Sequence, residues 1–200
     1  MKDEHNLPNA YKRIKAIKKH IENEEIKSTL NRFIYRYRIA RAFEGINAPE
    51  IGERTVRGYA VGMRLLLAYS AFDEIRATSN AISKLRPSQV PHAKVIDTEL
   101  ADNLRKNTAL QTLVSLPTAV KNASVKKNLV AFFQNKNDDV MCVATALRNT
   151  FAHGTFTAAG AGLTTKRSQK YIDNLADAVL DLTDDIALEC VAQLENELKG

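Results

Sequence analysis

Apolar residues recur three and four positions apart along most of the chain, and this spacing places them on one face of an α-helix. No stretch alternates apolar and polar residues for long enough to predict a strand. The expected fold class is therefore all-α, a bundle of about four to six main helices with an N-terminal helical extension. The pattern predicts one or two helices over residues 9–43 and further helices over residues 53–85, 97–116, 119–134, 139–152 and 166–198.

Glycine and proline mark the boundaries between these elements. Residues 45–52 begin and end with glycine and contain a proline, which makes them the clearest break in the pattern. We therefore divide the chain into a basic helical extension, residues 1–50, and a helical bundle, residues 51–200. Within the bundle, Gly58 and Gly62 lie four positions apart, a spacing that would let another helix approach closely.

The positive charge of the chain is concentrated at one end. The whole chain has 29 Lys and Arg against 23 Asp and Glu, a net charge of +6, and by direct count residues 1–41 hold all of this excess. In that segment Arg32 and Arg36 are candidate phosphate contacts, and Tyr35 beside them is a candidate for stacking on a base. Two interpretations stay open: a footprint for a polyanion such as RNA, or a solvated basic face that only aids solubility.

Several function classes are disfavoured by composition. The longest apolar stretch, near residues 65–67, is interrupted by Arg64 and is far shorter than the roughly 20 residues that cross a membrane. The N-terminus lacks the apolar core of a secretion signal. Cys142 and Cys190 are expected to be small buried residues in a reducing compartment, and no Cys/His spacing indicates zinc. We expect a cytoplasmic protein without a metal or other cofactor.

One short segment has the composition of a reactive site. Its residues are Arg148, Asn149, Thr150, Phe151, Ala152 and His153. Histidine can accept or donate a proton near neutral pH, arginine offers a charged fork for phosphate oxygens, and asparagine can orient the histidine or donate to phosphate. These are the groups needed when RNA is cleaved by its own 2′-hydroxyl.

Arginine followed at this distance by histidine is a weak signal alone, because Arg13 with His20 and Arg86 with His92 also fit a loose form of it. The third match differs in three ways. An asparagine follows the arginine directly, the segment ends an apolar helix, and Gly154 after the histidine is placed to stop that helix. The imidazole is therefore expected at an open helix end.

Arg148, Asn149 and His153 at the end of a bundle helix resemble the signature of the HEPN superfamily. The resemblance implies an α-helical, commonly dimeric protein, often an endoribonuclease of a toxin–antitoxin, phage-defence or CRISPR-associated system, with these three residues at the active positions. It covers residues 54–198 in architecture and about six residues in detail. Some family toxins carry a tyrosine two positions after the histidine that a nucleotidyltransferase antitoxin modifies; here that position is Thr155.

Five positions on a helix turn through about 500°, so Arg148 and His153 lie roughly 140° apart around the axis. One helix does not easily aim both side chains at one phosphate, and we therefore expect a homodimer whose paired motifs form one composite cleft. RNA is the expected substrate, and an antitoxin or other protein is a possible partner. Flanking phosphates are assigned to Lys166, Arg167 and Lys170 as well as to the two arginines of the extension.

Three alternatives stay open. The chain could be a non-catalytic HEPN-like module that binds RNA or protein. Arg148 could pair with an acidic neighbour while His153 only caps a helix, where a cation is favoured. Polar and acidic residues elsewhere could contribute, but they are expected to be ordinary helix-surface groups. This applies to Tyr69, Asp73 and Glu74, which could assist the histidine, and to Asp173, Asp177 and Asp181, which could bind a metal.

Overall fold

The fold is seen in a computed structural model that describes residues 9–85, 94–120, 123–154, 157–158 and 162–198. The described residues form eight α-helices and two short 3-10 helices, so the expected all-α class is confirmed. Their backbone pairing beyond the helices includes one isolated bridge between Ile96 and Asp139. The helices are α1 (Asn9–Ile17), α2 (Glu24–Ala42), α3 (Glu53–Leu85), α4 (Thr98–Arg105), α5 (Thr108–Gln111), α6 (Ala123–Phe133), α7 (Met141–Ala152) and α8 (Lys166–Glu197).

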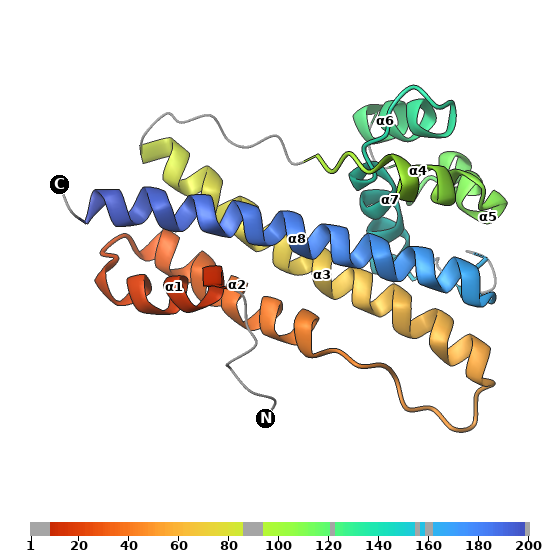
Figure 1. Cartoon of the computed structure of the whole chain (residues 1–200), viewed down its shortest axis with the longest axis horizontal. Helices are drawn as coiled ribbons and strands as arrows, with labels where there is room; N and C mark the ends of the chain where they lie inside the picture. Colours follow the sequence, from red (N-terminus) through yellow and green to blue (C-terminus); the bar gives the residue numbers. More distant parts are fainter. Residues whose placement is uncertain (1–8, 86–93, 121–122, 155–156, 159–161, 199–200) are drawn as a thin grey trace.

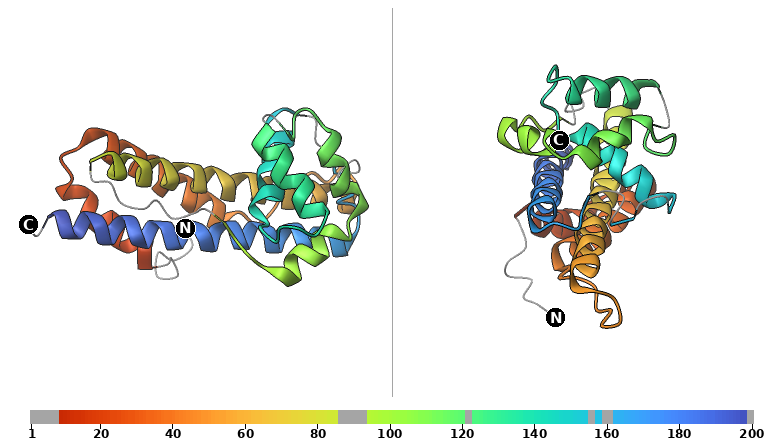
Figure 2. Two further views of the ribbon diagram at one scale, coloured as in Figure 1. Left: turned by 90° about the horizontal axis from the view of Figure 1, so that it is seen from above. Right: turned by 90° about the vertical axis from the view of Figure 1, so that its right-hand side faces the viewer.

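Two long helices form the spine of the molecule. Helices α3, of 33 residues, and α8, of 32 residues, run side by side in the same direction (Figure 1). Helices α1 and α2 cover their C-terminal halves, and α4 to α7 gather beside their N-terminal halves (Figure 2). None of the described helices has a stretch long and apolar enough to cross a membrane.

The extension and the bundle share one hydrophobic core. Tyr11, Leu30 and Tyr37, from α1 and α2, belong to the same cluster of buried side chains as Leu65 of α3 and Val179 of α8. Polar contacts join the same elements at the surface, because the Arg13 guanidinium donates to Glu195 and the Arg41 guanidinium to Asp184. Side chains on both sides of residue 50 therefore depend on one another for burial.

The ends of α7 follow from local chemistry. Asp139 Oδ1 accepts from the backbone N–H of Met141 at 3.1 Å and of Val95 at 3.0 Å, which anchors the start of the helix. At its other end, Gly154 adopts a φ of +64°, a left-handed conformation that glycine takes without strain. The predicted stop after residue 152 is confirmed. Thr155, residues 86–93 and part of the loop after Gly154 lie outside the described residues.

Candidate functional site

Helix α7 carries the candidate motif and crosses the first half of α3. A Cβ atom added to Gly62 would lie 1.8 Å from Cζ of Phe151, so only glycine lets the end of α7 approach this closely. Two turns of α3 further on, Tyr69 OH shares a 2.8 Å hydrogen bond with Thr145 Oγ1. The predicted close approach at Gly62 is confirmed, and these two contacts fix where the motif lies on α3.

Arg148 reaches from α7 to the surface of α3. Its Nη2 lies 3.2 Å from Oδ2 of Asp73, and its guanidinium carbon lies 5.8 Å from the ring centroid of Tyr69. Its Nη1 also donates to Oδ1 of Asn149 at 3.2 Å. About a third of the side chain stays exposed. The guanidinium is therefore both anchored and open to a ligand.

Asn149 is turned toward the interior. Its side chain is buried, and Nδ2 donates to the carbonyl oxygen of Ala119 at 3.3 Å. Within the single chain it holds Arg148 in place through Oδ1. A contact between Asn149 and the imidazole stays a prediction.

His153 is the residue at which α7 ends. Its backbone N–H still donates to the carbonyl of Asn149 at 3.2 Å, and its φ and ψ of −98° and 5° leave the helical region before Gly154. The residue is exposed. An exposed imidazole is free to exchange protons with a bound molecule, which a buried one could not do.

Asp73 is the acidic neighbour of Arg148. Burial raises the pKa of its carboxyl from the ordinary value of 3.8, and the positive charges of Arg148, Arg76 and Arg36 oppose that shift. Arg76 lies one turn further along α3, with Nη2 3.7 Å from Asp73 Oδ1. Sequence reasoning missed Arg76, although its spacing of three from Asp73 was a usable signal.

Glu74 and Tyr69 correct the expectation of ordinary surface groups, because both are buried. Helix α2 packs along α3 at this level, and its arginines enclose the Glu74 carboxylate. Arg32 Nε lies 2.9 Å from Oε2, and Arg36 Nη1 lies 3.0 Å from Oε1. The two predicted phosphate contacts of the extension therefore lie next to the motif, across α3.

The other predicted phosphate contacts lie elsewhere. Lys166, Arg167 and Lys170 are exposed on the first turns of α8. Gln169 Nε2 donates to the carbonyl of Arg54 at 3.1 Å, which places this turn beside the start of α3. Arg36, in contrast, contacts Ser70. Ser70 lies sixteen positions after Arg54 on α3 and therefore roughly 24 Å further along the helix axis. The structure separates these two basic groups and places the motif between them.

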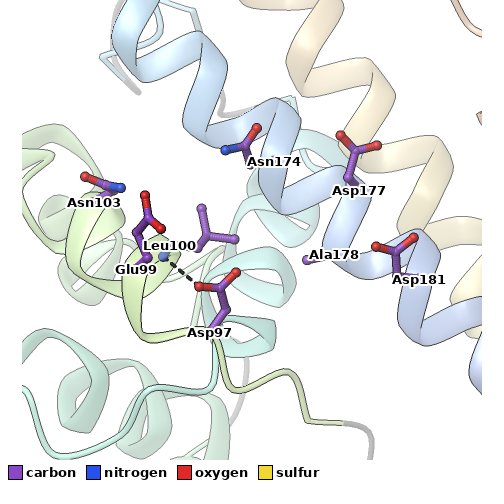
Figure 3. A pocket seen from close by; sticks show the side chains of 8 residues that line it. All are labelled: Asp97, Glu99, Leu100, Asn103, Asn174, Asp177, Ala178 and Asp181. Carbon is purple, nitrogen blue, oxygen red and sulfur yellow. Dashed lines mark hydrogen bonds between the residues drawn. The ribbon is translucent and has the colours of Figure 1, made fainter.

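The aspartates of α8 lie away from the motif. Arg64 Nη2 lies 2.6 Å from Asp177 and Nη1 3.3 Å from Asp173, so these two are ion-paired and not merely solvated. Asp177 and Asp181 face Asp97 and Glu99 of the α4 segment across a cavity of about 280 Å³ (Figure 3). Within the described ranges no three His, Cys, Asp or Glu residues cluster as metal ligands would. The acidic cavity repels a polyanion, so RNA is not expected there.

Comparisons of the chain with protein-family models, with curated proteins and with solved structures found no match.

Proposed function

We propose that this protein is a metal-independent endoribonuclease of the toxin or phage-defence kind, acts as a homodimer and belongs to the HEPN superfamily that its motif resembles. One observation supports this above all. The exposed His153 ends the same helix that presents the partly exposed guanidinium of Arg148, and no acidic side chain occurs in that helix. The proposal thus rests on side chains whose chemistry suits RNA cleavage and whose positions are open to a substrate.

The reaction follows from the groups available. One imidazole accepts the proton of the ribose 2′-hydroxyl, whose oxygen attacks the adjacent phosphorus. The bond from phosphorus to the 5′-oxygen breaks, and that oxygen takes a proton from an imidazolium. Arg148 neutralises charge on the non-bridging oxygens as the pentavalent phosphorane forms. The products are a 2′,3′-cyclic phosphate and a 5′-hydroxyl end.

Subunit pairing accounts for the orientation of the two side chains. Arg148 bends toward Asp73 and Tyr69 on α3, whereas His153 lies beyond the last turn of α7. Two motifs related by a twofold axis would bring Arg148 of one subunit and His153 of the other to one phosphate. The imidazolium formed by the first proton transfer at such a site can then protonate the 5′-oxygen.

The test combines cleavage and mixing. Single-stranded RNA is incubated with the full chain in EDTA, and product ends are identified by mass. His153→Ala and Arg148→Ala are each expected to abolish cleavage while the helical circular dichroism and the melting temperature are kept. His20→Ala is the matched control, since His20 is also exposed and also follows an arginine. Cleavage retained by both motif variants removes the proposal.

Mixing tests the composite site. Dimers co-expressed from the Arg148→Ala and His153→Ala chains contain one intact composite site in each mixed dimer. If half the dimers are mixed, about a quarter of the wild-type activity returns. No recovery in dimers shown to be mixed contradicts a site shared between subunits.

A second candidate is a non-catalytic module that binds RNA or protein. It is favoured by the contacts of Arg148 with Asp73 and of Asn149 with Ala119, which give both motif residues a structural role within one chain. Binding of RNA with a steep salt dependence and no product would support this function.

A further inference from the structure

Four arginines from three helices surround two adjacent carboxylates on the surface of α3. We call this group the arginine patch: Arg32 and Arg36 of α2, Arg76 of α3 and Arg148 of α7. Glu74 holds the first two, at 2.9 and 3.0 Å, and Asp73 holds the others, at 3.7 and 3.2 Å. The patch therefore joins the candidate motif to the basic extension.

The patch keeps a positive excess. Four guanidinium groups face the two carboxylates, and α7 contains no acidic residue to add a third. The four side chains are between 36% and 49% exposed. A polyanion that approaches this surface meets two uncompensated positive charges that are already close together.

The carboxylates also hold the arginines ready for a ligand. Glu74 lies buried beneath them and accepts through both oxygens, so it fixes the guanidinium of Arg32 and that of Arg36. Among the described residues, Arg36 uses Nη1 for both of its contacts: it donates to Oγ of Ser70 and pairs with Oε1 of Glu74. Each guanidinium has five N–H donors, so donors remain on the solvent side. Holding a long side chain in place beforehand lowers the entropy lost on binding.

An aromatic ring borders the patch. Tyr35 is 66% exposed on α2, three positions after Arg32 and therefore beside it on the helix surface. Exposed rings of this kind stack on unpaired bases, whereas a duplex keeps its bases stacked on one another. The combination of guanidinium groups and an exposed ring suits a single strand.

We propose that the arginine patch together with Tyr35 is a binding surface for single-stranded RNA, which crosses α3 from the motif on α7 to the outer face of α2. The inference rests on the proposed function, because the strand is the one that would be cut at His153. The surface extends beyond the motif, which contributes Arg148, onto α2 of the N-terminal extension. Its role is to hold the strand, with phosphates on the arginines and one base on Tyr35.

Binding is measured on the full-length His153→Ala protein, so that the probe stays intact. Anisotropy of a labelled single-stranded RNA gives the affinity at several salt concentrations. Arg76→Gln and Arg36→Gln are each expected to weaken binding and to make the slope of log affinity against log salt shallower by about 0.7. Tyr35→Ala is expected to weaken binding about five-fold or more with the slope unchanged, and Tyr35→Phe to preserve it.

Arg13→Gln is the matched control. It removes the same charge from an arginine that is also paired with a carboxylate and also about a third exposed, but that lies on α1 beside the end of α8. The melting temperature of each variant checks folding, and Arg76→Gln keeps the test valid if Arg36→Gln unfolds, since Asp73 then retains Arg148.

Equal effects of Arg76→Gln and Arg13→Gln would overturn the inference. So would binding of polyglutamate as tight as RNA and indifferent to Tyr35→Ala, because that pattern identifies a surface for an acidic protein. The proposed function is tested separately. If the wild-type protein binds RNA at this surface but does not cut it, the endoribonuclease proposal is refuted and the binding surface is not. Cleavage by a protein whose patch variants bind normally removes the inference alone.

Discussion

Arg148 of α7 and Asp73 of α3 form an ion pair, with 3.2 Å between Nη2 and Oδ2, across 75 positions of sequence. The residue predicted to clamp phosphate is thus already bound to a carboxylate in the single chain. A phosphate that binds Arg148 must compete with Asp73 or share the guanidinium with it. The pair therefore sets part of the affinity for RNA.

Replacing that carboxylate should strengthen RNA binding. Asp73→Asn keeps the size of the side chain and an acceptor oxygen but removes the competing charge. Because the pair is partly exposed, the gain in affinity should be no more than about five-fold. It is measured by anisotropy in the His153→Ala protein, with Asp102→Asn as the control, because Asp102 is paired to Arg105 beside the start of α7, at the end opposite His153. Weaker binding would show instead that Asp73 holds Arg148 in its binding position.

Gly62 is predicted to be indispensable to the position of α7. Alanine is favoured over glycine in a helix by about 0.8–1 kcal/mol, so propensity alone predicts a gain in stability from Gly62→Ala. The added Cβ would lie 1.8 Å from the Phe151 ring, and such overpacking costs about 1–3 kcal/mol or more. We expect a net loss of stability and of RNA cleavage, because Phe151 lies two residues before His153.

Two variants separate this steric effect from a general one. Gly52→Ala places its Cβ in open space and should leave the melting temperature almost unchanged. Combining Gly62→Ala with Phe151→Leu should recover part of the lost stability, because a smaller side chain makes room. A Gly62→Ala protein as stable and active as wild type would show that α7 adjusts freely.

The helices could be predicted well from sequence because their determinants are local. The expected 53–85 and 166–198 became Glu53–Leu85 and Lys166–Glu197, since apolar spacing together with helix-breaking residues such as Gly52 and Pro87 indicates where a helix begins and ends. The end of α7 at Gly154 was predictable for the same reason. Helix packing was not, because an apolar stripe shows which face is buried but not which helix covers it.

For the candidate site, the residues on one helix could be predicted from the sequence, but those brought together by helix packing could not. The motif on α7 could be found from residue types and spacing, whereas the patch depends on the antiparallel register of α2 along α3. That register brings Arg32 and Arg36 to Glu74 and leaves Lys166 at the far end of α3. Glu74 looked like a surface acid, because its own helix gives no sign that two arginines from another helix enclose it.

The shared core predicts that α1 and α2 do not unfold separately from the bundle. Leu30 of α2 is fully buried in the cluster that also contains residues of α3 and α8. Leu30→Ala should lower the free energy of unfolding by about 2–5 kcal/mol in one cooperative transition. Ile39→Ala removes a similar side chain from the exposed face of α2 and should change it by about 0.5 kcal/mol at most. Two transitions in the Leu30→Ala protein would show an independent extension.

Asp139 at the start of α7 should make stability depend on pH. Burial raises the pKa of its carboxyl above the ordinary 3.8, and the N–H groups of Val95 and Met141 oppose this shift without cancelling it. Between 3.8 and the raised value the folded chain binds more protons at this site than the unfolded chain does. The contribution of Asp139 to the free energy of unfolding therefore falls as pH rises through that window.

Asp139→Asn keeps an acceptor for both N–H groups and cannot ionise. Its free energy of unfolding therefore does not contain the pH-dependent decrease caused by Asp139. The melting temperature of the variant minus that of wild type should increase as the pH is raised from acid to neutral, and then level off. Asp185→Asn, on the exposed side of α8, controls for the loss of one negative charge. A difference that decreases with rising pH would mean that the two N–H donors stabilise the carboxylate by more than burial destabilises it.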